Sequence, residues 1–290
     1  MRLSLFGFLA LLCLSCHSGA AELRQVTFDQ VLALPASAPD AVLPYGTAPA
    51  QFGELWLPAN VAAPGSPLLV LIHGGCWLST YDVVHSRAMA MNLREAGYAV
   101  WSLEYRRVGD PGGGWPGTFD DIATGVDYIR QLQAYPIDLQ RVLLVGHSAG
   151  GQLALWAAAQ AGQPEAGATK PQILGVVGLA AIVDLAAYAG GSSGCERAAL
   201  ALMGAPPEEE PQRYQQASPL NLALPANTLL LQGTADPIVP LAATTVAAGA
   251  AGLRLLPIGD AGHFDLIHPG SDAWPQVLAA IRAGLSPPAP

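Results

Sequence analysis

One serine lies in a sequence that is typical of a catalytic nucleophile. Residues 146–150 read Gly-His-Ser-Ala-Gly, between an apolar run that ends at Val145 and an apolar helical pattern that follows. A turn this sharp needs small residues on both sides of the nucleophile, and it presents the serine oxygen at a helix amino terminus, where the dipole favours negative charge. The spacing therefore predicts Ser148 as a nucleophile rather than as a helix cap.

A serine hydroxyl is a weak nucleophile and needs a histidine to take its proton. Of the six histidines, His263 follows the last apolar run and is predicted to lie at the carboxyl edge of a sheet. His268 is the alternative base. His147 flanks the serine, and its side chain is expected to point away from the site.

The histidine in turn needs an acid that holds its tautomer. Asp236 stands in the turn after the preceding apolar run, in the chain order serine, acid, histidine. Asp260 is the competitor, but it is only three residues from His263 and is expected to reach the wrong face. We predict Asp236 as the acid, although an aspartate before a proline is also a common turn starter.

A tetrahedral oxyanion needs backbone N–H donors close by. Residues 73–77 read His-Gly-Gly-Cys-Trp after an apolar run, and glycines let the backbone approach a substrate oxygen. The amides of Gly75 and Cys76, together with that of Ala149, are the candidate donors. Gly74 and Trp77 are predicted to border the substrate pocket.

From residue 68 onward, continuous apolar runs alternate with helix-compatible stretches. The predicted strands are 68–73, 98–105, 141–146, 173–180, 228–233 and 253–258, and the predicted helices are about 83–96, 119–133, 149–161, 240–251 and 272–283. Continuous apolar strands alternating with helices favour a mostly parallel, doubly wound α/β sheet with helices on both faces. Alternating residues at 51–58 predict antiparallel edge strands. Residues 22–290 are expected to form this one domain.

The segment 185–222 interrupts this alternation. It holds a glycine- and serine-rich stretch, two consecutive prolines and three consecutive glutamates. The segment is interpreted as a lid or cap over the carboxyl edge of the sheet, and a plain solvated loop is the alternative.

The composition narrows the class of protein. Of the 290 residues, 51% are hydrophobic and 12% are charged, which excludes a disordered chain and indicates a large core. The net charge is −9 and there is no cluster of Lys or Arg, so nucleic acid and anionic lipid are not expected partners. The expected partner is a small-molecule substrate, and the sequence holds no histidine cluster that suggests a metal site.

The first 21 residues have the pattern of a secretory leader. Arg2 precedes an apolar run over 3–14, and small residues follow at 18–20; the run is too short to span a bilayer. The protein is therefore expected to be secreted or periplasmic. Residues 13–16 read Cys-Leu-Ser-Cys and resemble a bacterial lipobox, which leaves a lipid anchor on Cys16 open.

Two cysteines remain after the leader, Cys76 and Cys195. A compartment outside the cytoplasm permits disulfides. The sequence leaves open whether the two pair.

The chain resembles an α/β-hydrolase of the esterase/lipase superfamily over about residues 42–285. Residues 73–77 are similar to the H-G-G-x-W motif of the kynurenine formamidase (arylformamidase) branch and its feruloyl-esterase-like neighbours, and 146–151 to its nucleophile elbow. Residues 45–58 resemble the opening segment of that branch, and 104–106 resemble its strand-end motif. The resemblance implies a cofactor-free hydrolase with Ser148, Asp236 and His263 as its triad. It departs at position 76, where Cys replaces an aromatic residue or glycine.

Three functions follow as hypotheses. The first is a secreted carboxylic-ester hydrolase, favoured by the leader. It would prefer short acyl groups on aryl alcohols, because Trp77 offers an aromatic face and no basic cluster holds a charged group. The second is an amide hydrolase, either a peptidase or an arylformamidase acting on N-formylkynurenine or similar anilides. The third is a non-catalytic binding protein, which a complete triad argues against.

Overall fold

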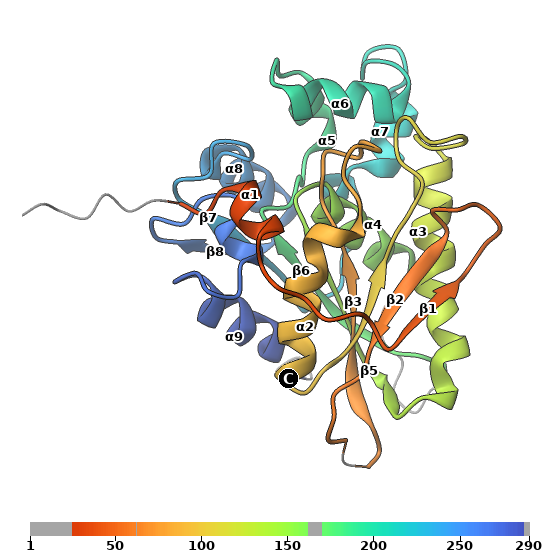
Figure 1. The fold of residues 1–290 in the computed structure, drawn as a ribbon. Helices are drawn as coiled ribbons and strands as arrows, with labels where there is room; N and C mark the ends of the chain where they lie inside the picture. The colour runs from red at the N-terminus through yellow and green to blue at the C-terminus, as the bar shows by residue number, and fades with distance from the viewer. Residues whose placement is uncertain (1–24, 62, 162–169, 287–290) are drawn as a thin grey trace, which may run out of the picture.

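The computed structural model describes residues 25–286, apart from residue 62 and residues 162–169 (Figure 1). The expected leader and its lipobox at Cys16 lie outside the described residues. No helix within the described ranges is long and apolar enough to cross a membrane.

Within the described residues, eight strands form one sheet in the order β1-β2-β4-β3-β5-β6-β7-β8. The strands are β1 (Ala41–Pro44), β2 (Phe52–Trp56), β3 (Ser66–Ile72), β4 (Ala99–Leu103), β5 (Ile137–His147), β6 (Ile173–Leu179), β7 (Thr228–Gly233) and β8 (Arg254–Ile258). The strands from β4 to β8 along this order are parallel, and β2 is antiparallel to both β1 and β4. The predicted α/β fold class is confirmed, including the antiparallel addition at one edge.

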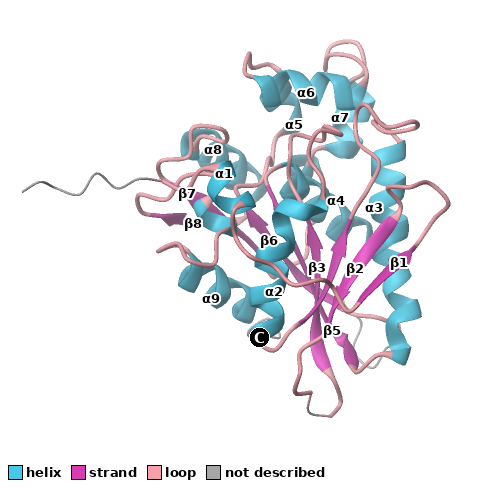
Figure 2. Cartoon of the chain, viewed as in Figure 1, coloured by secondary structure: helices cyan, strands magenta, loops and turns pink. Residues whose placement is uncertain are grey.

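Helices cover both faces of the sheet (Figure 2). The helical elements are α1 (Phe28–Leu32), η1 (Val83–Ser86), α2 (Arg87–Glu95), α3 (Gly117–Asp127), η2 (Tyr128–Ala134), α4 (Ala149–Ala161), α5 (Leu185–Ala189), α6 (Gly194–Met203), α7 (Pro211–Ala217), η3 (Pro219–Asn221), α8 (Leu241–Ala251), η4 (Asp265–Ile267) and α9 (Trp274–Gly284). One apolar core joins the sheet to α3, α4 and α8, and the other joins it to α1, α2 and α9. The central strands are continuous apolar runs because both of their faces are buried.

The segment 185–222 is helical. It contains α5, α6, α7 and η3. The helices α5, α6 and α7 lie beyond one end of the sheet, at the top of Figure 1. The Leu202 carbonyl accepts a hydrogen bond from the Trp115 amide at 2.7 Å, and the Ala217 carbonyl accepts one from the Gln152 side chain at 2.8 Å. These bonds attach the segment to the α/β core, so it is a packed layer rather than a solvated loop. We call α5–α7 the cap.

Two glycines in helices provide a matched test of the packing around β5 and α4. A Cβ atom at Gly150 would lie 2.2 Å from the carbonyl oxygens of Ile72 and His73, whereas a Cβ atom at Gly249 in α8 would meet nothing within 4 Å. We expect Gly150→Ala to lower the free energy of unfolding by about 3 kcal/mol through overpacking. Gly249→Ala should raise it by about 0.5–1 kcal/mol through helix propensity. Urea denaturation of both variants measures this, and equal effects would contradict the close packing.

Candidate active site

Ser148 is the single residue between the end of β5 and the start of α4. Its φ is 55°, in the left-handed region that side chains rarely adopt, and the residue is only 3% exposed. A Cβ atom at Gly146 would lie 2.1 Å from the Gly150 carbonyl oxygen, and one at Gly74 would lie 3.1 Å from the Ser148 Cβ. Glycine is therefore required around this turn, which holds the serine at the amino terminus of α4.

Asp236 and His263 are brought together by the loops that follow β7 and β8. The Asp236 Oδ2 atom lies 2.7 Å from Nδ1 of His263, and both side chains are buried. His263 is next to the Ser148 turn, because its ring centroid is 4.6 Å from that of His147. Among the described residues, Nε2 of His263 forms no hydrogen bond, either with the Ser148 hydroxyl or with another group.

The surroundings of Asp236 keep its carboxylate charged. Burial by itself would raise its pKa, but the hydrogen bond and charge of His263 and the amides of Val239 and Ile238 outweigh burial and lower the pKa. The two amides donate to Oδ1 at 2.9 and 2.8 Å, and Gln232 donates to Oδ2 at 2.8 Å. A charged acceptor at this position favours the tautomer of His263 that carries its proton on Nδ1.

The alternative residues are not part of this arrangement. His268 is half-buried, and its Nδ1 accepts a hydrogen bond from the Gly270 amide at 3.1 Å, within its own turn. Asp260 is exposed, and its backbone amide donates to Thr234. The carboxylate beside His263 is thus that of Asp236, as the chain order predicts.

The turn after β3 presents backbone amides. Gly75, Cys76 and Trp77 have consecutive positive φ values of 107°, 53° and 58°. Among the described residues, no group accepts a hydrogen bond from the amides of Gly75, Cys76 or Ala149. We call residues 74–77 the oxyanion turn, because its unpaired amides and that of Ala149 are the predicted oxyanion donors.

Trp77 does not present an aromatic face to a substrate. Its side chain is 0% exposed, and the indole N–H donates to Oε1 of Gln152 at 3.1 Å. The expectation that this indole borders the pocket is wrong, because the backbone at positions 76 and 77 directs the ring into the core beneath the cap. Gly74 does lie beside the nucleophile, as its distance from Ser148 shows.

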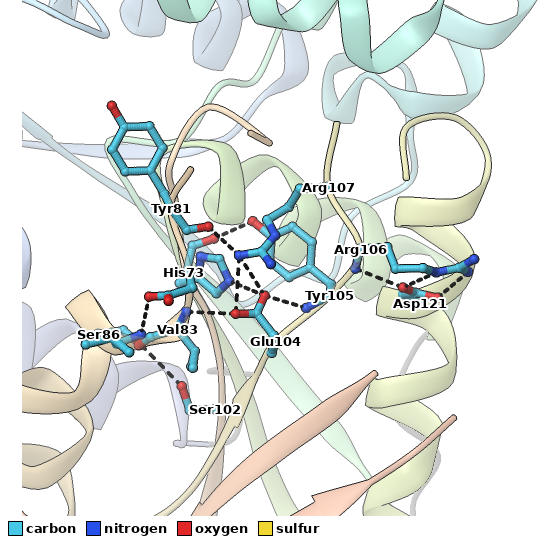
Figure 3. A network of polar contacts seen from close by, with 12 residues as sticks. His73, Tyr81, Val83, Ser86, Ser102, Glu104, Tyr105, Arg106, Arg107 and Asp121 are labelled. Carbon is cyan, nitrogen blue, oxygen red and sulfur yellow. Dashed lines mark hydrogen bonds and ion pairs between the residues drawn. The ribbon is translucent and has the colours of Figure 1, made fainter. Parts of the chain in front are cut away.

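Buried Glu104, directly after β4, anchors the segment that leads into the oxyanion turn (Figure 3). Its Oε1 lies 3.0 Å from Nε2 of His73 and accepts the Tyr105 amide at 2.8 Å, while its Oε2 accepts the Val83 amide at 3.0 Å. Burial would raise the pKa of Glu104, but the charge and hydrogen bond of His73, the charge of Arg107 and the Tyr105 amide lower it. The carboxylate of Glu104 therefore remains charged although it is buried.

This network reaches the backbone on both sides of His73. Nδ1 of His73 is 2.7 Å from the Gly74 carbonyl oxygen, and the Tyr105 hydroxyl donates to the His73 carbonyl at 2.8 Å. Arg107 donates to the Tyr81 carbonyl, beyond the turn. The motif at 104–106 therefore helps to hold the oxyanion turn in place. The sequence alone did not indicate this role.

His147 contacts His263, so the expectation that its side chain points away from the site is wrong. Its Nε2 lies 3.0 Å from the His263 carbonyl oxygen and donates to it, and it is buried. Burial, and then the neighbouring His263, hold the pKa of His147 well below its usual range, so the ring is neutral. Its Nδ1 is buried without a hydrogen-bond partner among the described residues. His147 positions the loop that carries His263.

Cys76 and Cys195 form a disulfide, with their Cα atoms 5.0 Å apart. The bond joins the oxyanion turn to α6 of the cap across 119 positions of sequence. Both cysteines are half-buried. In the described residues, no group of three or more His, Cys, Asp or Glu side chains could hold a metal ion.

Comparison with known proteins identifies the family. Residues 54–249 match the BD-FAE family, which is more than half of the chain. The chain belongs to the BD-FAE family. Together with the relatives below, this match confirms the predicted resemblance to the esterase/lipase superfamily of α/β-hydrolases.

Two curated relatives of this BD-FAE-family chain are similar over short segments. Esterase LipC of Mycobacterium tuberculosis is 27% identical over 129 residues, which cover 44% of this chain and 32% of LipC. A probable isoprenylcysteine alpha-carbonyl methylesterase of Oryza sativa is 28% identical over 111 residues, or 38% of this chain and 26% of that protein. The chain thus spans between a quarter and a third of the length of these relatives.

Solved structures share the fold over most of the chain. Esterase B from Lactobacillus rhamnosus superposes with a TM-score of 0.71 and 21% identity, covering 88% of this chain and 89% of that one. A truncated carbohydrate esterase from gut microbiota gives a TM-score of 0.70 with 20% identity, covering 87% and 98%. These likenesses support the fold assignment.

The contact between His147 and His263 makes a testable prediction. His147→Phe keeps a ring at this position but removes the hydrogen bond to the His263 carbonyl, so kcat should fall about five- to tenfold with little change in KM. His268→Phe is the matched control and should leave kcat unchanged. Steady-state kinetics on one ester substrate measure both, and an unchanged kcat in His147→Phe would exclude a positioning role.

The disulfide makes a second prediction. Closing a loop of this length stabilises a chain by about 4–5 kcal/mol in the chain-entropy account, and loss of a native bridge commonly costs about 2–5 kcal/mol. Cys195→Ser should therefore lower the free energy of unfolding by about 2–5 kcal/mol, measured in denaturant titrations. Mass spectrometry after treatment with a thiol reagent should find Cys76 unlabelled until reduction. A labelled Cys76 in the unreduced protein would show that the bridge does not form.

Proposed function

We propose that this protein is a serine hydrolase that cleaves carboxylic esters through an acyl-enzyme on Ser148. The observation that carries the proposal is the 2.7 Å contact of buried Asp236 with His263, beside the left-handed turn at Ser148. A nucleophile, a base and an acid that orients the base are the parts that acyl transfer requires. The esterase names of the curated relatives support the same activity.

The reaction follows from the available atoms. Oγ of Ser148 attacks the ester carbonyl carbon while Nε2 of His263 takes the hydroxyl proton. The negative oxygen that forms is bound by the unpaired amides of Gly75, Cys76 and Ala149. The ester C–O bond then breaks, and His263 returns the proton to the leaving alcohol. Water repeats the sequence on the acyl-enzyme and releases the carboxylic acid.

The cap favours short acyl groups. The disulfide joins α6 of the cap to Cys76, whose amide is one of the proposed oxyanion donors. The buried side chain of Trp77 lies beneath the cap. A cap tied to the oxyanion turn in this way favours a small acyl group over a long chain. We therefore keep the proposal of acetyl to butyryl esters as substrates.

We also propose that the protein acts outside the cytoplasm. The leader pattern at 1–21 supports export, and a disulfide between Cys76 and Cys195 suits an oxidising compartment. A lipid anchor on Cys16 stays an open alternative within this proposal.

Ser148→Ala tests the proposed nucleophile. The variant should fold normally but hydrolyse p-nitrophenyl acetate with kcat lowered by about three orders of magnitude or more, because the oxyanion donors and binding alone remain. Circular dichroism checks the fold, and release of p-nitrophenol measures the rate. Near wild-type activity would rule out Ser148.

The same assay separates ester from amide hydrolysis. We expect the wild type to have a higher kcat/KM for phenyl acetate than for N-formylkynurenine, because an amine leaves only with full protonation by His263. A preference of more than tenfold for N-formylkynurenine would make the protein an arylformamidase instead.

A further inference from the structure

Three half-buried aromatic rings lie between the oxyanion turn and His263. The Tyr81 side chain packs against Gly75, where a Cβ atom would lie 2.4 Å from the Tyr81 Cβ. The Phe264 ring is 5.1 Å from that of His263 and nearly perpendicular to it. The Phe28 ring lies 5.4 Å from Tyr81 and 5.5 Å from Phe264, and so joins the two. We call Phe28, Tyr81 and Phe264 the aromatic cluster.

Phe28 comes from α1, at the other end of the sequence from His263. The Asp265 carboxylate holds the two segments together, because its Oδ2 accepts the amides of Val26 and Gly262, both at 3.0 Å. The close approach also needs Gly262, where a Cβ atom would lie 2.7 Å from that of Gln25. The chain thus carries Phe28 to the loop that holds the proposed base.

The cluster differs from ordinary core packing. Unlike the fully buried Trp77, all three residues are only half-buried. Figure 3 shows the Tyr81 phenol pointing away from the Glu104 network, and no group in the described residues forms a hydrogen bond with its hydroxyl. The guanidinium of nearby Arg107 forms ion pairs with the carboxylates of Glu104 and Asp110. The three half-buried side chains here are therefore aromatic, and the Tyr81 hydroxyl has no hydrogen-bond partner among the described residues.

We infer that the aromatic cluster is the subsite for an aromatic ring on the alcohol side of the ester. Phe264 adjoins His263, and His263 delivers the proton to the leaving oxygen, so the group attached to that oxygen lies on the Phe264 side. Rings that meet edge to face, as Phe28 and Tyr81 do at 89°, accept a further ring in the same geometry. The inference rests on the proposed ester hydrolysis, and it assigns the expected aryl alcohol to the aromatic cluster in place of the buried Trp77.

The test compares two acetates that differ in aromaticity alone. Benzyl acetate and cyclohexylmethyl acetate have leaving groups of similar size and similar basicity, so the ratio of their kcat/KM values reports ring recognition. We expect the wild type to favour benzyl acetate by about tenfold. Phe28→Leu should lower the ratio about three- to tenfold, as the loss of one aromatic pair predicts. A general loss of activity cancels in the ratio.

Phe52→Leu is the matched control. Phe52 is half-buried in β2, beside the edge strand β1, and its variant should keep the wild-type ratio. If Phe28→Leu fails to fold, Phe264→Leu and the wild-type ratio itself decide.

A wild-type ratio near one, with both esters hydrolysed, would overturn the aromatic subsite and leave the esterase intact. A Phe28→Leu ratio equal to that of wild type would do the same. Hydrolysis of neither ester would overturn the proposed function, and the subsite with it.

Discussion

The turn between β5 and α4 brings backbone segments so close together that side chains would prevent it. A Cβ atom at Gly146 would collide with the Gly150 carbonyl, and one at Gly150 would collide with the carbonyls of Ile72 and His73. These contacts press the elbow at Ser148 against the end of β3, from which the oxyanion turn begins. Backbone packing therefore sets the position of the Ser148 turn relative to the end of β3, and the side chains of the Glu104 network hold the oxyanion turn that follows.

Two buried carboxylates complete this arrangement. Glu104 and Asp236 are both buried, and both remain charged because amides and histidines surround them with donors. Glu104 acts through His73 on the segment before the oxyanion turn, while Asp236 orients His263. His85, packed at 5.3 Å against His73, has its pKa lowered to about 3 by burial and by His73, so it adds no charge to the network. Removing either carboxylate would leave buried donors without partners.

Local sequence patterns predicted the strands, the elbow, and the pairing of Asp236 with His263, because each depends on residues close in sequence and on strand order. They could not predict contacts between distant segments. The burial of Trp77 depends on how the cap packs against the core. The contact of His147 with His263 depends on the path of the loop after β8. Phe28 lies beside the site because the segment before it is bound by Asp265, which is 237 positions from Phe28 along the chain. No sequence pattern near Phe28 predicts this contact. The pairing of Cys76 with Cys195 needed the three-dimensional position of α6.

Labelling with a fluorophosphonate probe tests the central claim most directly, since such probes react with serines that a neighbouring base activates. The purified protein should gain the mass of one adduct, and peptide mapping should locate it on Ser148, with labelling slowed when a His263→Ala variant is used. No adduct, or an adduct on a different serine, would contradict the assignment of Ser148 and His263 as the nucleophile and its base.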